Sequence, residues 1–159
     1  RFLPGGTMTR GMLVTVLYRL AGEPSVQGLE NPFYDVSLNR YYGAPVLWAS
    51  ANGLVEGHGN GKFTPEGNVT RQDMAVILYR YAQQMGYDTT PVGDLTAFPD
   101  ADRVSGYAAD PMRWAVGNGI IHGVKNGQTN TLSPRAYSTR AQVAVVLQRF
   151  VEKIVEDPV

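Results

Sequence analysis

An internal repeat constrains what this chain can fold into more than any other feature of its sequence. The tetrapeptide FYDV at residues 33–36 recurs as FPDA at residues 98–101, and NGLVEG at residues 52–57 recurs as NGIIHG at residues 118–123. These matches set a repeat length of about 65 residues. A unit of this size is too small to bury its own apolar face, so we expect neighbouring copies to pack on one another.

The last part of the unit occurs three times. Its copies are MTRGMLVTVLYRL from Met8, VTRQDMAVILYRY from Val69 and STRAQVAVVLQRF from Ser138. The first copy lacks its front half. We therefore divide the chain, as one compact module, into the C-terminal half of a first repeat (residues 1–30), a second repeat (residues 31–96) and a third repeat (residues 97–159).

Each copy has the pattern of a helix, a glycine-rich loop and a second helix, which predicts a mainly α fold. Thr9, Thr70 and Thr139 directly precede the second helix and are its expected N-caps. Apolar residues at spacings of three and four predict one buried stripe on each second helix. The stripes comprise Leu13, Val16, Leu17 and Leu20; Met74, Ile77, Leu78 and Tyr81; and Val143, Val146, Leu147 and Phe150.

The first helix is expected at about residues 41–52 and 107–118, with a proline in its first turn. Gly53 and Gly119 follow it as the expected left-handed C-caps. Two apolar pairs come next and fit either very short strands or plugs of the core: Leu54-Val55 and Ile120-Ile121.

Composition excludes several classes of function. Fourteen Lys and Arg side chains balance fourteen Asp and Glu side chains, so the chain lacks the broad positive field that attracts nucleic acid or an anionic membrane. No apolar run approaches the ~20 residues that span a bilayer, and we expect no membrane insertion. Because cysteine is absent, disulfides, thiolate metal sites and thiol catalysis are excluded.

Metal and catalytic patterns are missing too. The loops after Gly57 and Gly123 have neither the alternating carboxylates of a calcium loop nor the G-x-x-x-x-G-K of a phosphate loop. His58 and His122 do not occupy equivalent positions, which argues against a zinc site. No Ser-His-Asp set or carboxylate pair stands out. We therefore expect a binding protein, not an enzyme, with no metal or cofactor.

Three arginines are the sharpest oddity. Arg10, Arg71 and Arg140 each follow the capping Thr at the first helical position. A cation there opposes the helix dipole at a cost of about 0.3–1 kcal/mol, so helix formation alone does not explain it. Beside unpaired N–H groups, the guanidinium would form a receptor for a carboxylate or phosphate. The alternative is a structural ion pair with an internal carboxylate such as Asp35 or Asp100, and the residues alone leave both open.

Tyr41 and Tyr107 stand at the front of the first helix, where an aromatic ring can stack on a sugar. Burial in the core is the alternative for these tyrosines. Asp35 and Asp100 belong to the F-x-D segments and can act as bases, ligands or caps. The favoured role of each aspartate is a local Asx-type turn.

Other aromatic residues are expected to be structural. Trp48 and Trp114 fall on the predicted packed face of the first helix. Tyr18 and Tyr79 have Gln148 as their counterpart in the third copy, so we expect this position to lie at the surface.

The stretch FYDV…YYGAPVLWASANGLVEGHGNGKFTPEGNVTRQDMAVILYRYA closely resembles the S-layer homology repeat, with its F-x-D-V start, aromatic first helix, glycine loop ending in F-x-P and closing T-R-A-E helix. The resemblance covers nearly the whole chain, about residues 31–86 and 97–154 plus the closing half of the preceding repeat. It implies three repeats in a pseudo-threefold arrangement around a central helix bundle with projecting prongs. It also implies an extracellular location at the bacterial cell wall or surface layer.

The resemblance further implies a non-catalytic anchoring function. Modules of this family bind secondary cell-wall polysaccharide, usually pyruvylated and therefore anionic, in grooves between repeats. The ligand-binding residues that correspond by position are Arg10, Arg71 and Arg140 of T-R-A-E, the aromatic residues Tyr41 and Tyr107, and Asp35 and Asp100 of F-x-D. Tyr replaces the usual Trp, and the family's Glu is replaced by Met12, Asp73 and Gln142. The alternative function is protein–protein assembly with other surface-layer proteins.

Overall fold

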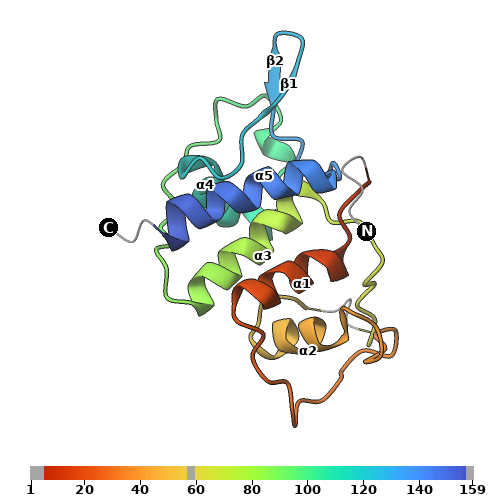
Figure 1. The fold of residues 1–159 in the computed structure, drawn as a ribbon. Coiled ribbons are helices and arrows are strands. Elements are labelled where there is room, and N and C mark those ends of the chain that lie inside the picture. The colour runs from red at the N-terminus through yellow and green to blue at the C-terminus, as the bar shows by residue number, and fades with distance from the viewer. Residues whose placement is uncertain (1–5, 57–59, 157–159) are drawn as a thin grey trace. The chain divides into compact units, whose positions relative to one another are not determined.

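The computed structural model describes residues 6–56 and 60–156 of the chain. Within these residues the fold is mainly α, as predicted, with two very short strands. The elements are the helices α1 (Arg10–Leu20), α2 (Gly43–Ala51), α3 (Arg71–Gln84), α4 (Ala109–Gly117) and α5 (Arg140–Phe150), and the strands β1 (Val124–Asn126) and β2 (Thr129–Thr131) (Figure 1). Short 3-10 turns at Ala101–Arg103 and Gly106–Ala108 precede α4, and a π-helical turn at Val151–Val155 continues α5.

The chain divides into two compact units, and this division does not follow the sequence repeats. Met8–Val69 form the first unit, and Thr70–Val159 together with Arg1–Thr7 form the second unit. Each unit joins the closing helix of one repeat to the front half of the next repeat, α1 to α2 and α3 to α4. The second unit also contains α5 and the antiparallel β1–β2 hairpin, which projects from the helices of its unit (Figure 1).

The closing helices begin as predicted. The hydroxyl of each capping threonine accepts a hydrogen bond from the backbone N–H three residues on: Thr9 from Met12, Thr70 from Asp73 and Thr139 from Gln142. In α1 and α5 the side chain at that third position bonds back to the N–H of the threonine, through Met12 Sδ at 3.3 Å and Gln142 Oε1 at 2.9 Å. These reciprocal bonds satisfy donors that the helix itself leaves unpaired.

The first helices also lie where the sequence predicts them. Pro45 and Pro111 occupy the third position of α2 and α4, where the first turn tolerates a residue without an N–H. Gly53 and Gly119 follow with φ angles of +73° and +71° and therefore form the expected left-handed caps. The apolar pairs that come next are buried and plug the core. The short strands lie further along, in the glycine loop of the third repeat.

The predicted buried stripe is correct for α3 and partly wrong for the other closing helices. All four stripe residues of α3 are buried, whereas Val16 and Leu20 of α1 are 37% and 40% exposed. In the second unit Tyr81 packs against the other closing helix, α5: the centre of its ring lies 5.9 Å from that of Phe150. The described part of the first unit contains no second closing helix, so its α1 has no such partner there. Leu147 of α5 is half-buried.

The tryptophans are core residues, as predicted, but the expected surface position of Tyr18 and Tyr79 is wrong. Trp48 is 6% exposed and Trp114 is fully buried. The ring of Tyr18 lies 5.5 Å from that of Trp48, and the ring of Tyr79 lies 5.5 Å from that of Trp114. The tyrosine position therefore faces the first helix of the following repeat, which is why it is aromatic in both copies.

Candidate ligand-binding site

The arginines of the first two T-R motifs, Arg10 and Arg71, reach the loop of the next repeat. Arg71 donates from Nε to the carbonyl oxygen of Leu132 at 2.8 Å and from Nη2 to that of His122 at 2.7 Å. Arg10 donates at the equivalent positions, to Phe63 at 3.0 Å and to Glu56 at 3.4 Å. Its guanidinium also lies 4.5 Å from the centre of the Phe63 ring, a cation–π distance. Both arginines thus tie a closing helix to the loop that follows it.

The backbone at the start of α1 and α3 is occupied as well. The N–H groups of Arg10 and Gly11 donate to the carbonyl oxygens of Gly67 and Pro65 at 2.8 and 2.9 Å. In α3 the corresponding N–H groups of Arg71 and Gln72 donate to Ala136 and Pro134 at 2.9 and 2.8 Å. The expectation of unpaired N–H groups at these helix ends is therefore wrong, because the loop of the next repeat supplies the acceptors.

The start of α5 receives residues from the beginning of the chain. The N–H of Arg140 donates to Gly6 at 2.7 Å, and Thr139 pairs with Thr7 as an isolated bridge. Thr9 pairs with Asn68 and Thr70 pairs with Tyr137 in the same way. The side chain of Arg140 is half-buried.

The F-x-D aspartates hold the same loops from the other side. Asp35 accepts from the N–H groups of Phe63 and Thr64 at 2.9 and 2.8 Å. Asp100 accepts from the corresponding N–H groups of Leu132 and Ser133, both at 2.9 Å. The favoured local Asx-type turn is therefore wrong, because these partners lie far along the chain.

These loop bonds coincide with unusual backbone. Thr64 and Ser133 adopt φ angles of +62° and +47°, in the left-handed region that residues with a side chain rarely occupy. Each carboxylate bonds the N–H of such a residue, so it helps to hold a strained turn. Burial tends to raise the pKa of Asp35, but its hydrogen bonds from Phe63 and Thr64 outweigh this effect and hold the pKa below its ordinary value.

The charges of arginine and aspartate act on each other through space. Burial, the larger effect, lowers the pKa of Arg71, and the negative charge of Asp100 raises it in part. Arg71 is only 7% exposed. Its Nε and Nη2 bonds end on carbonyl oxygens, so Asp100 does not bind it through those two donors.

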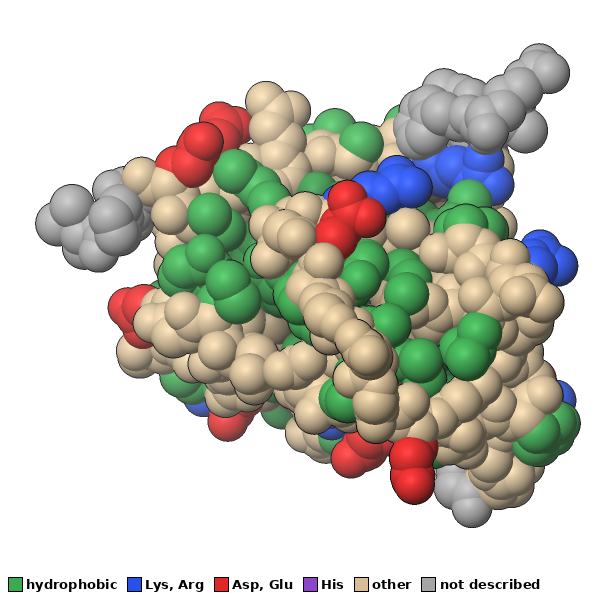
Figure 2. Space-filling view, turned by 60° about the horizontal axis from the view of Figure 1, so that its bottom comes forward, with side chains coloured by type: hydrophobic (Ala, Val, Ile, Leu, Met, Phe, Trp, Pro, Cys, Tyr) green, Lys and Arg blue, Asp and Glu red, His purple; other side chains and the backbone are tan. Residues whose placement is uncertain are grey.

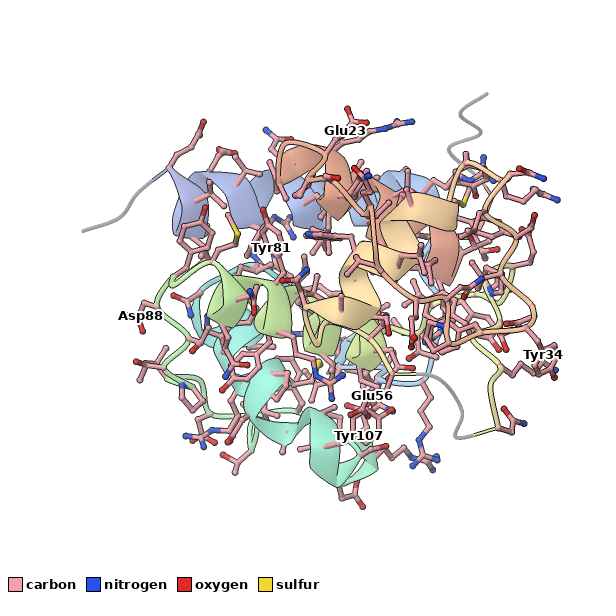
Figure 3. The ribbon with its side chains drawn as sticks, turned by 90° about the horizontal axis from the view of Figure 1, so that it is seen from below. Glu23, Tyr34, Glu56, Tyr81, Asp88 and Tyr107 are labelled. Atoms are coloured by element: carbon pink, nitrogen blue, oxygen red, sulfur yellow. The ribbon has the colours of Figure 1, made fainter. Side chains whose placement is uncertain are left out.

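The two first-helix tyrosines are open to solvent. Tyr41 is 51% exposed and Tyr107 is 57% exposed, which leaves their rings accessible to a ligand and argues against the core alternative. Tyr107 lies just before α4, in the short turn Gly106–Ala108 (Figure 3). Both tyrosines therefore have the exposure that stacking on a sugar requires.

A polar network surrounds Tyr107, and we call Gln72, Asp73, Ser105 and Tyr107 the Tyr107 cluster. The Tyr107 hydroxyl donates to Asp73 Oδ1 at 2.6 Å and lies 3.4 Å from Gln72 Nε2. Gln72 and Ser105 exchange two bonds of 3.0 Å, from Gln72 Nε2 to the serine hydroxyl and from the serine N–H to Gln72 Oε1. Burial and then the bond to Asp73 raise the pKa of the Tyr107 hydroxyl.

The first unit lacks this network. Gly11 and Met12 stand where α3 has Gln72 and Asp73, and Tyr41 packs edge-on against Tyr42 with ring centres 5.1 Å apart. Gln72 and Ser105 do not recur in the other copies, so the repeat pattern does not single them out. Their polar side chains beside Tyr107 were the available signal.

The face shown in Figure 2 carries charged side chains of both signs. In the space-filling view acidic and basic side chains are scattered, and neither covers a continuous area (Figure 2). Across residues 6–56 and 60–156 there is no group of three or more His, Asp or Glu side chains placed to hold a metal ion. His58, discussed above as a metal ligand, lies outside the described residues. None of the described helices has the length and apolar character of a bilayer-spanning segment.

Helix–loop–helix repeats define this chain as a mainly α tandem-repeat module. An arginine ties each of the first two closing helices to the loop of the next repeat, and an aspartate of that next repeat holds the same loop. The model of the S-layer homology domain matches residues 32–75 and 97–144, and the chain belongs to this family. It is an anchoring module, and its place is the extracellular surface of the cell.

Similar proteins are much longer than this chain. The Surface-layer 125 kDa protein of Lysinibacillus sphaericus is 34% identical over 158 residues, covering 99% of this chain and 13% of that protein. The Cellulosome-anchoring protein of Acetivibrio thermocellus is 31% identical over 102 residues, covering 64% and 22%. The Exoglucanase XynX of Acetivibrio thermocellus is 27% identical over 154 residues, covering 96% and 14%. The chain spans from 7% to 22% of the length of the curated relatives it matches.

Proposed function

We propose that this module holds a larger exported protein on the bacterial surface by binding an anionic, pyruvylated secondary cell-wall polysaccharide. The observation that carries the proposal is the exposed tyrosine at the same place in two repeats of an anchoring family. Each exposed ring offers an apolar face to a sugar ring. Around Tyr107, the amide, carboxylate and hydroxyl groups of the cluster offer hydrogen bonds to sugar hydroxyls.

The arginines supply the positive charge in this proposal. A guanidinium has five N–H donors, and the loop carbonyls take the Nε and one Nη2 donor of Arg71. The guanidinium groups of Arg10, Arg71 and Arg140 are the proposed partners of the pyruvate carboxylate. Asp35 and Asp100 are assigned a positioning role, because their carboxylates are directed to loop N–H groups.

Calorimetric titration tests the proposal with the whole chain and purified pyruvylated wall polymer. We expect binding to this polymer and at least about tenfold weaker binding after the pyruvate groups are removed by mild acid, since a charge-assisted hydrogen bond contributes about 1.5–3 kcal/mol. Equal binding to both polymers would show that the anion is not recognised. No binding to either polymer would refute the polysaccharide function.

Tyrosine variants locate the site. Tyr107→Ala should weaken binding about two- to thirteenfold, because the ring contact contributes about 0.5–1.5 kcal/mol. Tyr34→Ala is the matched control, since Tyr34 is 74% exposed and lies outside the proposed site. If Tyr34→Ala weakens binding as much as Tyr107→Ala, the assignment of the site is wrong.

A pull-down separates this function from protein assembly. The chain is incubated with wall fragments before and after chemical removal of their polysaccharide. Loss of retention on stripped fragments supports polysaccharide binding. Retention on stripped fragments supports the assembly alternative.

A further inference from the structure

Asparagine is followed directly by glycine at four places in the chain, and the fold gives these pairs different surroundings. They are Asn52-Gly53, Asn60-Gly61, Asn118-Gly119 and Asn126-Gly127. In such a pair the backbone nitrogen of the glycine can attack the side-chain amide carbon of the asparagine, because glycine has no Cβ to obstruct the approach. The four pairs share this chemistry, so their surroundings decide which of them reacts.

Two of the pairs are held at helix ends. After α4 the side-chain amide of Asn118 donates to the carbonyl oxygen of Trp114 at 2.8 Å, and the N–H of Gly119 donates to that of Val116 at 3.0 Å. The pair after α2 makes equivalent bonds of 2.9 and 3.2 Å. The nitrogen that would attack and the amide that would be attacked are therefore both bonded, and these bonds must break before any reaction.

The pair Asn60-Gly61 is anchored in another way. The side-chain oxygen of Asn60 accepts from the N–H of Lys62 at 3.1 Å. The carbonyl oxygen of Gly61 accepts from the N–H of Tyr34 at 2.9 Å, and a Cβ on Gly61 would lie 3.4 Å from the Tyr34 ring. These contacts restrict the rotation that would bring the Gly61 nitrogen to the side chain of Asn60.

The fourth pair lies at the tip of the β1–β2 hairpin. Asn126 ends β1 and pairs with Thr129, so Gly127 and Gln128 form the turn. Asn126 and Gly127 are both exposed. Apart from its chain neighbours, a Cβ on Gly127 would meet no atom of the described residues within 4 Å. The hairpin projects from the helices of its unit, so space is available around this pair (Figure 1).

The hairpin also has little packing to hold it. Its two strands have three residues each, and five of these six residues are exposed. A two-stranded hairpin without packing is marginally stable in water, so it opens locally at small cost and gives Asn126 the backbone freedom that the attack requires. The chain after Asn118 is fixed, because Ile120 is fully buried and its N–H bonds to Ala115 at 2.8 Å.

We propose that Asn126 is a site of spontaneous deamidation in the folded chain. The backbone nitrogen of Gly127 loses its proton and forms a bond to Cγ of Asn126. The bond from Cγ to Nδ2 breaks, and the amide nitrogen leaves with that proton as ammonia. Water then opens the resulting five-membered imide at either of its two carbonyl carbons. The products are aspartate and isoaspartate at position 126, and the reaction requires no oxidant and no enzyme.

The reaction changes the hairpin in two ways. Either product adds one negative charge to a chain in which fourteen basic and fourteen acidic side chains balance. Isoaspartate also places one extra carbon atom in the backbone, which disturbs the register in which Asn126 pairs with Thr129. The hairpin tip therefore becomes heterogeneous in charge and in backbone length as the protein ages.

Peptide mapping by mass spectrometry tests the proposal on the whole chain. The folded chain is incubated at mildly alkaline pH in heavy-oxygen water and digested, and electron-transfer dissociation distinguishes isoaspartate from aspartate. We expect Asn126 to convert at least about tenfold faster than Asn118, because the bonds at Asn118 must break first and a tenfold rate corresponds to only about 1.4 kcal/mol. Equal rates, or faster conversion at Asn118, would overturn the proposal.

The same chain unfolded in urea is the control for the role of the fold. Unfolding removes the hydrogen bonds of every pair, so the rates at Asn52, Asn118 and Asn126 should converge. If Asn126 leads by the same factor in urea, the selectivity comes from the flanking residues and the assigned role of the hairpin is wrong.

The variant Asn126→Gln separates this residue from Asn130, which is exposed on the same hairpin. A glutamine has to close a six-membered ring, which is slower, so conversion in this peptide should fall to the level seen at Asn118. Circular dichroism should show an unchanged fold, because position 126 is exposed. Conversion that persists in the variant would assign the reaction to Asn130 and overturn the proposal.

Discussion

The backbone of Phe63 and that of Leu132 are each hydrogen-bonded to an aspartate of the same repeat and to an arginine of the preceding repeat. The N–H of Phe63 bonds to Asp35 while its carbonyl oxygen bonds to Arg10. Leu132 stands between Asp100 and Arg71 in the same way. The arginine and the aspartate thus bind the two sides of one loop residue. This structural role explains why an arginine stands at a helix start, where the helix dipole disfavours a cation.

Repetition was sufficient to single out these arginines and aspartates but not to assign their roles. A structural contact recurs in each copy as regularly as a ligand site does. Their partners are also peptide groups, which leave no trace in residue types. The sequence therefore predicts that these arginines and aspartates matter, but it does not predict their hydrogen bonds to the loop. The repeat pattern also gives no sign of Gln72 and Ser105, which are not repeated.

Removing the carboxylate of Asp35 should destabilise the first unit. Asp35→Ala leaves the N–H of the fully buried Phe63 without its acceptor, at an expected cost of about 1–3 kcal/mol in the free energy of unfolding. Urea denaturation monitored by circular dichroism measures this change. Asp102→Ala, at an exposed position, is the control and should change stability by less than about 0.5 kcal/mol.

The same carboxylate sets a pH dependence. The pKa of Asp35 is lower in the folded chain than its ordinary value of 3.8, so its contribution to stability is full above that value. It is lost as the pH falls through the folded pKa, because protonation is then required. We expect the stability difference between the parent and Asp35→Ala to shrink from pH 6 to about pH 2. A difference that grows on acidification would contradict this role.

The closing helices share one apolar pattern, but equivalent residues of that pattern differ in burial from helix to helix. The helical period correctly predicted that α1, α3 and α5 are amphipathic, and the threonines correctly predicted where they begin. Periodicity reports the width of an apolar stripe but not which neighbour covers each part of it. Val16 and Leu20 are therefore exposed although Ile77 and Tyr81, at the same positions of α3, are buried.

The caps should contribute measurably to these helices. Thr70→Ala removes the acceptor of the Asp73 N–H and should lower the free energy of unfolding by about 1 kcal/mol. Thermal or urea denaturation measures the loss. Thr129→Ala, on the exposed hairpin, should have less than half that effect, and equal effects would show that the cap is not stabilising.

At the scale of the whole chain, the repeat length does not predict where one compact unit ends and the next begins. Self-comparison predicted copies and a mainly α fold, and both are confirmed. A periodic sequence can be divided at any point, however, and the compact units are divided just before the T-R motif. The pseudo-threefold arrangement and the division into residues 1–30, 31–96 and 97–159 remain predictions.

Fragments distinguish the two divisions. The fragment 8–69 contains α1, α2 and the loop that bonds to both Asp35 and Arg10. The fragment 31–96 contains α2 without α1, and α3 without α4. We expect the fragment 8–69 to retain more helix and to melt more cooperatively, because it keeps its buried Tyr18–Trp48 contact. Circular dichroism on heating measures both properties, and a more cooperative fragment 31–96 would show that the repeat is the folding unit.

The arginines recognise the following loop through its peptide groups, so these hydrogen bonds do not depend on the loop side chains. Glu56 and His122 have side chains of different chemistry, yet each presents a carbonyl oxygen to the arginine before it. Phe63 and Leu132 differ likewise. Because each arginine binds main-chain oxygens, the loop residues that supply them can differ in chemistry from one repeat to the next while the hydrogen bonds are preserved.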